Sequence, residues 1–298
     1  MASVLKRVLV TGSSGFIGSA LCRQLDQMKE IYQVYTLNRS GDGQNHIRAD
    51  ITIDNLTSKI IDINPEVIVH LAGNVSVPYS VEFPLEDFNV NARGTLALLL
   101  AAKNTDCKNF VYVTSGGAIY DSYAPIPFKE SSPINPVSPY GLSKFVGEGY
   151  VRVLSEARGS EWSSLAISNV YGSVKMQKQG VVYRFWNDIQ NGISPTVFGA
   201  SVARDFIHID DVVGALIKVI EKPVNCRINI SSNTSTKLLD LLGEILNIMG
   251  SDTSPTIEEA KFGDVIVSQL DNSKAKDLVS WYPRVDLMNG LERSLLKK

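Results

Sequence analysis

Two side chains four positions apart could carry out acid–base chemistry near the middle of the chain. Tyr140 and Lys144 open the segment YGLSKFVGEGYVRVLSEARG, whose apolar spacing predicts a helix with both side chains on one side. A phenol with a pKa of about 10 is a poor acid or base at neutral pH, but a nearby ammonium favours phenolate and lowers that pKa. The pair could therefore exchange a proton with a sugar hydroxyl while hydride moves to or from a nicotinamide. The same spacing is common in surface pairs, so the hypothesis depends on the rest of the chain.

A glycine-rich turn lies upstream of this pair, between a predicted strand and a predicted helix. Its sequence, TGSSGFIG, spaces its glycines by three residues, which departs from the G-x-G-x-x-G pattern. Glycine allows the backbone to turn tightly and approach a pyrophosphate, and a helix start offers free N–H groups and a positive dipole end. We expect a dinucleotide diphosphate to bind at Gly12, Gly15, Phe16, Ile17 and Gly18.

The size and charge of the chain limit the classes of function that fit. It has 298 residues, and its formal net charge of -2 gives no basic excess for nucleic acid or an acidic membrane surface. No window approaches the ~18 apolar residues of a membrane span, and the N-terminus lacks the order of a secretory signal. The scattered, odd-numbered cysteines Cys22, Cys107 and Cys226 argue against a disulfide framework and predict three small buried hydrophobic side chains and a cytoplasmic location. The histidines have no metal-ligand spacing, so no metal is expected.

Apolar runs that stop at glycine or serine alternate with segments of helical periodicity through the first half of the chain. This alternation predicts an α/β fold, a doubly wound parallel sheet whose ligands lie beyond the carboxyl ends of its strands. After about residue 170 the pattern becomes less regular, which indicates a smaller second lobe. Predicted strands lie at 7–12, 33–38, 67–73, 110–117 and 163–172, and predicted helices at 16–28, 88–104 and 140–159.

Further motifs follow in a fixed order. They are HLAG at 70–73, NVNARGT at 89–95, YVTSGGAIY at 112–120, SNVYG at 168–172, RDFIHIDD at 204–211 and KFGD at 261–264. Together with the glycine turn and the Tyr–Lys pair, this set resembles the extended short-chain dehydrogenase/reductases, the nucleotide-sugar epimerase/dehydratase family. The resemblance covers nearly the whole chain.

The resemblance implies two lobes with separate ligands. A Rossmann-type lobe, at 1–168 with a return segment near 206–232, would bind NAD or NADP. A smaller, mixed C-terminal lobe, at 169–205 and 233–298, would bind a nucleoside-diphosphate sugar. The family also implies a homodimer, paired through two long helices around 85–104 and 140–158.

Carried over residue by residue, the resemblance implies that Tyr140 is the catalytic acid/base and that Lys144 is its partner, with both also contacting the cofactor. The other implied cofactor contacts are Asp50, Ile51, Leu71, Ala72, Gly73 and Asn91. The implied substrate contacts are Ser76, Asn169 and Arg204. A guanidinium suits phosphate because it can form two parallel hydrogen bonds, but Arg204 could instead form an ordinary ion pair with Asp205 or Asp211. Asp50 could likewise be a plain turn residue.

Two departures from the family pattern concern the loop after residue 113. The family usually has Ser or Thr where this chain has Gly116, so Ser115 or Thr114 would have to supply the hydroxyl that bonds the substrate's O4. Ser115 is the preferred candidate for this catalytic contact. The dehydratase branch has an Asp-Glu pair where this chain has Gly117 and Ala118, so elimination of water lacks its evident acid.

Another departure lies on the substrate side. An arginine that is common before the SNVYG-type motif is absent, with Ala166 and Ile167 in that region. Lys261 stands where the family often has a diphosphate-binding arginine. Lysine still binds phosphate, but as a point charge. These changes leave the identity of the sugar open.

The last departure is at the end of the second predicted strand, in YTLNRSG. An NAD-binding fold usually has a carboxylate there, about 20 residues beyond the glycine turn, to accept hydrogen bonds from the ribose. Here Asn38 removes the repulsion of a 2′-phosphate, and Arg39 with Ser40 can supply charge and a donor. We expect NADP(H) to be preferred, while NAD remains possible because Asn38 could also bind an unmodified ribose.

Two reactions of a nucleotide sugar fit these residues. The first is an NADPH-dependent 4-keto reductase of a nucleoside-diphosphate (6-deoxy)hexose, favoured by the strand end without a carboxylate. The alternative is a 4-epimerase like the UDP-glucose enzymes, which takes hydride from C4 and returns it to the other face, generally with retained NAD. A non-catalytic NADP-binding sensor is an outside alternative that would not need Tyr140 and Lys144.

Overall fold

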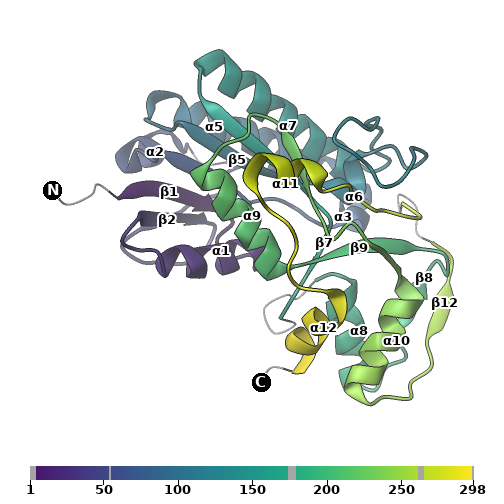
Figure 1. Ribbon diagram of the computed structural model, residues 1–298. Helices are drawn as coiled ribbons and strands as arrows, with labels where there is room; N and C mark the ends of the chain where they lie inside the picture. Colours follow the sequence, from purple (N-terminus) through teal and green to yellow (C-terminus); the bar gives the residue numbers. More distant parts are fainter. Residues whose placement is uncertain (1–4, 54, 174–178, 261–264, 297–298) are drawn as a thin grey trace. The chain divides into compact units, whose positions relative to one another are not determined.

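The computed structural model describes residues 5–53, 55–173, 179–260 and 265–296 (Figure 1). The chain forms two compact units. The first comprises Met1–Ser115, Ser138–Ala166 and Val213–Ile228, and the second comprises Gly116–Val137, Ile167–Val212 and Asn229–Lys298. In the described ranges, every helix is either too short or too polar to span a bilayer.

The first unit is built on a seven-stranded sheet in the order β10-β6-β5-β4-β1-β2-β3. Strand β1 pairs in parallel with both β2 and β4, so the strand order reverses beside β1. Such a reversal creates a crevice beyond the carboxyl ends of the two strands, where ligands bind. The strands are β1 (Lys6–Thr11), β2 (Tyr32–Asn38), β3 (His46–Arg48), β4 (Val67–His70), β5 (Asn109–Ser115), β6 (Glu161–Ile167) and β10 (Arg227–Ile230).

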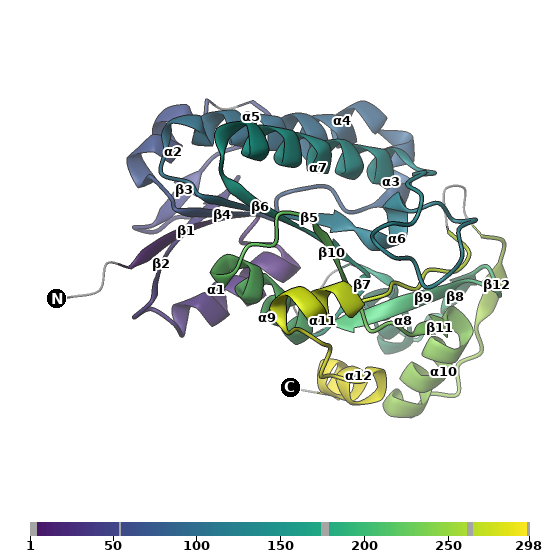
Figure 2. The ribbon, with the colours of Figure 1, turned by 45° about the horizontal axis from the view of Figure 1, so that its top comes forward.

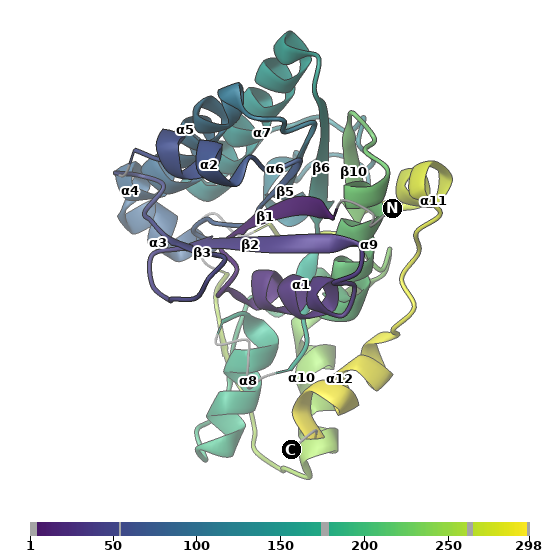
Figure 3. The ribbon, with the colours of Figure 1, turned by 90° about the vertical axis from the view of Figure 1, so that its left-hand side faces the viewer.

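Helices cover both faces of this sheet, as the doubly wound prediction requires (Figures 2 and 3). One face carries α2 (Thr57–Ile63), α5 (Gly94–Ala101) and α7 (Pro139–Arg158), and the other carries α1 (Phe16–Asp26) and α9 (Ile209–Glu221). The central strands β1 and β4 are buried on both faces, which explains their continuous apolar runs. A buried cluster that includes Leu9, Ile68, Leu98 and Tyr112 fills the space between β-sheet and helices.

The segment predicted as one helix over 88–104 contains a change of helical type. It consists of α4 (Pro84–Phe88), the π-helical turn η1 (Asn89–Arg93), α5 and the 3-10 turn η2 (Ala102–Asn104), and the short helix α3 (Val77–Glu82) precedes it. A π-helical turn is rare and often marks a functional position. Here it contains Asn91, whose side chain faces the turn after β4.

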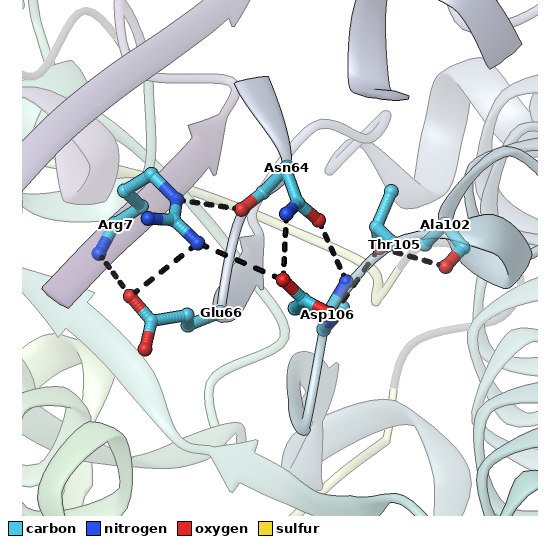
Figure 4. Close-up of polar contacts among 7 residues, drawn as sticks. Arg7, Asn64, Glu66, Ala102, Thr105 and Asp106 are labelled. Atoms are coloured by element: carbon cyan, nitrogen blue, oxygen red, sulfur yellow. Dashed lines mark hydrogen bonds and ion pairs between the residues drawn. The ribbon is translucent and has the colours of Figure 1, made fainter. Parts of the chain in front are cut away.

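The amino-terminal edge of the sheet is tied together by a polar cluster (Figure 4). Arg7 at the start of β1 donates from Nε to the Asn64 carbonyl at 2.7 Å and from its backbone N–H to Glu66 at 3.0 Å. Asn64 and Asp106 exchange two hydrogen bonds, at 2.6 and 2.7 Å. These bonds join the loops that lead into β1, β4 and β5, so this edge serves stability and leaves the opposite edge to ligands.

The second unit contains two small sheets, in the orders β11-β9-β7 and β12-β8. The run predicted as one strand over 163–172 divides into β6 of the large sheet and β7, because the chain passes to a different sheet at Ser168. A separate apolar core that includes Tyr171, Phe185, Phe206 and Leu241 holds this unit together. Its strands are β7 (Asn169–Tyr171), β8 (Thr196–Phe198), β9 (Ala203–His208), β11 (Ser235–Lys237) and β12 (Thr256–Glu258), and its helices are α6 (Gly116–Ile119), α8 (Val181–Gln190), α10 (Leu238–Met249), α11 (Ser273–Val279) and α12 (Leu287–Leu296).

Candidate active site

The glycine turn joins β1 to α1 at the carboxyl edge of the first unit's sheet. Gly12 has φ +68, and a Cβ there would lie 2.6 Å from the backbone nitrogen of Ala72, so both conformation and space require glycine. Gly15 precedes α1 in an extended conformation, and no side chain caps the helix start. The first N–H groups of α1, from Phe16 onward, can therefore bind an anion.

Asn38, at the end of β2, binds this glycine turn. Its Oδ1 accepts from the Ser14 N–H at 3.2 Å, and its Nδ2 donates to the Ser13 hydroxyl. Both amide atoms are thus used to hold the turn, which the sequence analysis did not foresee. Arg39 and Ser40, the next two residues, are exposed.

A basic cavity of about 380 Å³ opens beside this strand end. Arg39, Arg48 and Lys59 line it together with Ala49 and Asp50. Lys59 donates to the Arg48 carbonyl at 3.1 Å, which places two cations that the sequence analysis missed next to Arg39.

The carboxylate in this cavity is held ionised. Asp50 Oδ1 accepts hydrogen bonds from the Thr52 N–H at 2.8 Å and from the Thr52 hydroxyl at 2.7 Å. Burial raises the pKa of Asp50, but these bonds and the Arg39 guanidinium outweigh it and leave the pKa below its ordinary value. The next side chain, Ile51, is buried in the core, where it would collide with any Cβ on Gly94.

Residues 71–73 form the turn after β4, and Asn91 braces it. Asn91 Oδ1 accepts from the Asn74 N–H at 2.9 Å, and its Nδ2 donates to the Asn74 carbonyl at 3.3 Å. A Cβ on Gly73 would lie 2.7 Å from Asn91 Oδ1 and 3.8 Å from Lys144 Nζ. Leu71, Ala72 and Gly73 therefore form a wall whose last residue, Gly73, lies next to the Lys144 ammonium of α7.

Helix α7 begins at the Tyr–Lys pair. The Ser138 hydroxyl caps it by accepting from the Gly141 N–H at 3.2 Å, and Pro139 occupies its first turn. Tyr140 is half-buried and anchored through its N–H to the Ser80 hydroxyl at 3.0 Å. Lys144 is 7% exposed, with Nζ 4.3 Å from the centre of the Tyr112 ring. Tyr140 and Lys144 thus lie one helical turn apart at the start of α7, as their spacing predicted.

The loop hydroxyl that meets the phenol is that of Ser115. Ser115 ends β5, and its hydroxyl lies close enough to the side chain of Tyr140 to lower the pKa of the phenol. Thr114, the other candidate, is 2% exposed, and its hydroxyl has no hydrogen-bond partner among the described residues. Successive side chains of a strand point to opposite faces, which is why only one of the two reaches Tyr140.

The electrostatics of the pair differ from the expectation that the ammonium lowers the pKa of the phenol. Burial raises the pKa of Tyr140 to about 12, although the Ser115 hydrogen bond lowers it. Burial lowers the pKa of Lys144 to about 7, although the charge of Asp87 raises it. Enclosure penalises phenolate and ammonium alike, so each group is shifted towards its neutral form in the protein alone.

The candidate substrate contacts lie in both units. In the first unit, Ser76 caps α3 by accepting from the Tyr79 N–H at 3.2 Å. In the second unit, Asn169 opens β7, and Arg204 lies on the adjacent strand β9, where its Nη1 donates to the carbonyls of Ala203 and Ile266 at 3.0 and 3.3 Å. Lys261 lies outside the described residues.

Of the two positions of the missing dehydratase acids, Ala118 is buried and Gly117 is partly exposed. A Cβ on Gly117 would lie 3.7 Å from Asn169 Oδ1 and 3.8 Å from the Ser268 hydroxyl, both ordinary contacts. The lack of an acid at this position is thus a feature of the sequence and not of a crowded loop.

Comparison with known proteins finds full-length similarity to UDP-glucose 4-epimerases. The chain is 33% identical to UDP-glucose 4-epimerase of Mycolicibacterium smegmatis over 97% of both chains. Its structure matches UDP-glucose 4-epimerase of Thermotoga maritima, solved with UDP-glucose, with a TM-score of 0.91 and 31% identity over 97% of both chains. It matches UDP-glucose 4-epimerase of Thermus thermophilus, solved with NAD, with a TM-score of 0.88 and 28% identity over 97% of both chains. The family model for NAD dependent epimerase/dehydratase proteins matches residues 8–231, and the chain belongs to this family.

Proposed function

We propose that the protein is a nucleotide-sugar 4-epimerase that moves hydride to and from sugar C4, with Tyr140 as acid/base. The observation that carries this proposal is the Tyr140 phenol beside the Ser115 hydroxyl, followed one helical turn later by the buried Lys144. From the sequence, the β2 end without a carboxylate favours a 4-keto reductase. The full-length similarity to UDP-glucose 4-epimerases favours its alternative, the epimerase, and UDP-hexoses are the proposed substrates.

The residues of the first unit would perform the proton transfers. A nicotinamide dinucleotide, when bound, supplies the hydride acceptor and donor. Tyr140 takes the proton of the 4-hydroxyl and later returns it to O4, while Ser115 hydrogen-bonds the same oxygen and orients it. A protonated Lys144 would favour the phenolate form of Tyr140, against the burial that raises the pKa of the phenol. Without an acid at Gly117 or Ala118, the keto sugar has no catalyst for loss of water.

The binding roles divide between the two units in this proposal. In the first unit, the amides at the start of α1 hold the cofactor diphosphate, and the wall at 71–73 and Asn91 hold its middle. In the second unit, Asn169, Arg204 and Lys261 bind the diphosphate of the substrate, and the carbonyl contacts of Arg204 fix its guanidinium for that purpose. Ser76, at the start of α3, is the remaining proposed substrate contact.

NADP(H) is the proposed form of the cofactor. The cavity lined by Arg39, Arg48 and Lys59 contains three cations and one carboxylate, Asp50, which gives it an excess of positive charge for a 2′-phosphate. Asn38 adds no negative charge, and its side chain is engaged by the glycine turn. Since a T. thermophilus relative was solved with NAD, NAD is the competing cofactor.

A homodimer is the proposed assembly. Large apolar side chains are exposed along α7, at Leu142, Tyr150 and Val153, and on the neighbouring helix α5, at Leu100. A second copy of this chain would cover them.

A cytoplasmic location also stays a proposal, supported by three cysteines that are all free thiols.

The decisive experiment is to incubate the purified protein with UDP-glucose without added nucleotide and to follow UDP-galactose by chromatography. We expect interconversion, and a loss of ~10²–10⁴-fold in Tyr140→Phe with cofactor binding retained. The control is Tyr123→Phe, which alters a 92% exposed tyrosine of the second unit. Stoichiometric consumption of NADPH with a 4-keto sugar, and no interconversion, would instead establish the reductase. Full turnover in Tyr140→Phe would overturn the role of the phenol.

A further inference from the structure

A carboxylate without a direct counterion is enclosed beside the Tyr–Lys pair. Asp87, on α4, is 0% exposed. Its Oδ1 accepts from Asn91 Nδ2 at 3.0 Å, and its Oδ2 accepts from the Ser143 hydroxyl at 2.5 Å. In the described part of the chain, no cationic side chain lies within ion-pair distance of it. Burial of such a charge is costly, so the position calls for a function.

The two donors connect Asp87 to the first turns of α7 and to the turn after β4. Ser143 immediately precedes Lys144, and its hydroxyl also lies 3.0 Å from the Tyr140 carbonyl. Asn91 Nδ2 lies 3.2 Å from the same hydroxyl and, through its contacts with Asn74, fixes the turn that borders Lys144. The three side chains of Asp87, Asn91 and Ser143, hereafter the Asp87 network, join α4, the π-helical turn and α7.

The other groups that titrate around Lys144 cannot replace this charge. Glu148, on the same helix, is paired with Arg227, whose Nε lies 2.9 Å from Oε1. His70 of β4 is buried between two threonine hydroxyls, and burial together with Lys144 lowers its pKa to about 3, so it is neutral. Burial raises the pKa of Tyr112 of β5 well above its ordinary value, so it is also neutral. Asp87 raises the pKa of Lys144 more than Glu148 does. Burial raises the pKa of Asp87 itself, and the bonds from Ser143 and Asn91 together with the charge of Lys144 oppose that rise.

We propose that Asp87 is a positioning residue that favours the ammonium form of Lys144 against the effect of burial and, through Ser143, holds the turn that carries Tyr140. The inference rests on the proposed function only in that Tyr140 and Lys144 are the acid/base pair. An anion raises the proton affinity of every nearby group, so Asp87 favours protonated Lys144 and also protonated Tyr140. Removal of its charge must therefore lower the pKa of both.

The test is Asp87→Asn in protein labelled with ¹³Cε-lysine, with Lys144 assigned by the signal lost in Lys144→Met. We expect the Lys144 titration midpoint to fall by about one pH unit, since a neighbouring charge shifts a pKa by about 1–3 units. Both limbs of the pH profile of kcat/KM should move to lower pH as well. Glu86→Gln, which removes an exposed charge from the same helix, is the control and should leave both unchanged.

A folded Asp87→Asn variant with an unchanged Lys144 midpoint would overturn the proposal, because a purely structural role changes stability and kcat but no titration. Asp87→Ser removes the same charge with a smaller side chain and provides the same comparison if the Asn variant is not recovered folded. Asp87→Glu keeps the charge and should keep the midpoint. A shifted midpoint in a protein that never interconverts UDP-hexoses would support the Asp87 network and refute the proposed function.

Discussion

Asn38 shows how one side chain can have two consequences at the scale of the residue. Its amide holds Ser13 and Ser14 in the phosphate turn, and its neutrality leaves the adjoining cavity positive. A carboxylate in its place could accept the same Ser14 N–H but would repel a 2′-phosphate. The cofactor choice therefore depends on the cations that surround the cavity.

Arg39→Ala tests that choice. We expect affinity for NADP to fall about 10-fold or more, the equivalent of one charge-assisted hydrogen bond, while affinity for NAD stays nearly unchanged. Isothermal titration of each cofactor into the protein freed of nucleotide measures both. Arg23→Ala, which removes an exposed arginine of α1, is the matched control. An equal loss for both cofactors would show that Arg39 does not recognise the 2′-phosphate.

At the scale of the element, the position of α7 depends on its closest approach to the sheet and to the π-helical turn. A Cβ on Gly147 would lie 2.5 Å from the Tyr112 hydroxyl and 2.9 Å from the Asn91 carbonyl, so only glycine fits there. Gly149, on the same helix, has nothing within 4 Å of its Cβ position. The close packing at Gly147 therefore sets the distance between Asn91 and the turn of α7 that carries Tyr140 and Lys144.

Substitution of the two glycines by alanine should therefore have opposite effects. Gly147→Ala must displace α7, and we expect a loss of ~1–3 kcal/mol in unfolding free energy together with reduced turnover. Gly149→Ala gains helix propensity and should stabilise by up to ~1 kcal/mol with turnover retained. Urea unfolding curves give both values. Equal stability changes in the two variants would contradict the close packing at Gly147.

At the scale of the whole molecule, the exposed apolar side chains of α5 and α7 bear on assembly. One stripe of α7 contains Leu142, Tyr150 and Val153. Eight residues separate the first two and three residues separate the last two, which puts all three on one side of the helix. Because single exposed hydrophobic residues are ordinary, it is the grouping on adjacent helices that indicates a partner.

Val153→Glu should shift the protein from dimer to monomer in sedimentation velocity, because a charge buried in an apolar interface is costly. Tyr123→Glu, at a 92% exposed position of the second unit, should leave the dimer intact. A Val153→Glu protein that sediments as the dimer would show that this face is not the interface.

The fold was largely predictable because it depends on local patterns. Apolar runs that end at glycine and helical periodicity predicted the parallel sheet, which is observed, and the turn at Gly12 lies at the carboxyl end of β1 as expected. The break of the 163–172 run between two sheets was not predictable, because β6 and β7 share one β-type pattern and differ only in the strands they pair with.

The sequence by itself determined the phosphate turn, the Tyr–Lys spacing and the absence of the dehydratase acids, since each is a matter of residue type and local distance along the chain. Only the tertiary structure decided that Ser115 and not Thr114 meets Tyr140, that Arg48 and Lys59 join Arg39, and that Asp87 is enclosed beside Lys144. Those outcomes depend on which segments far apart in sequence are packed together and on how much water they exclude, and burial is what moves the pKa values of Tyr140 and Lys144.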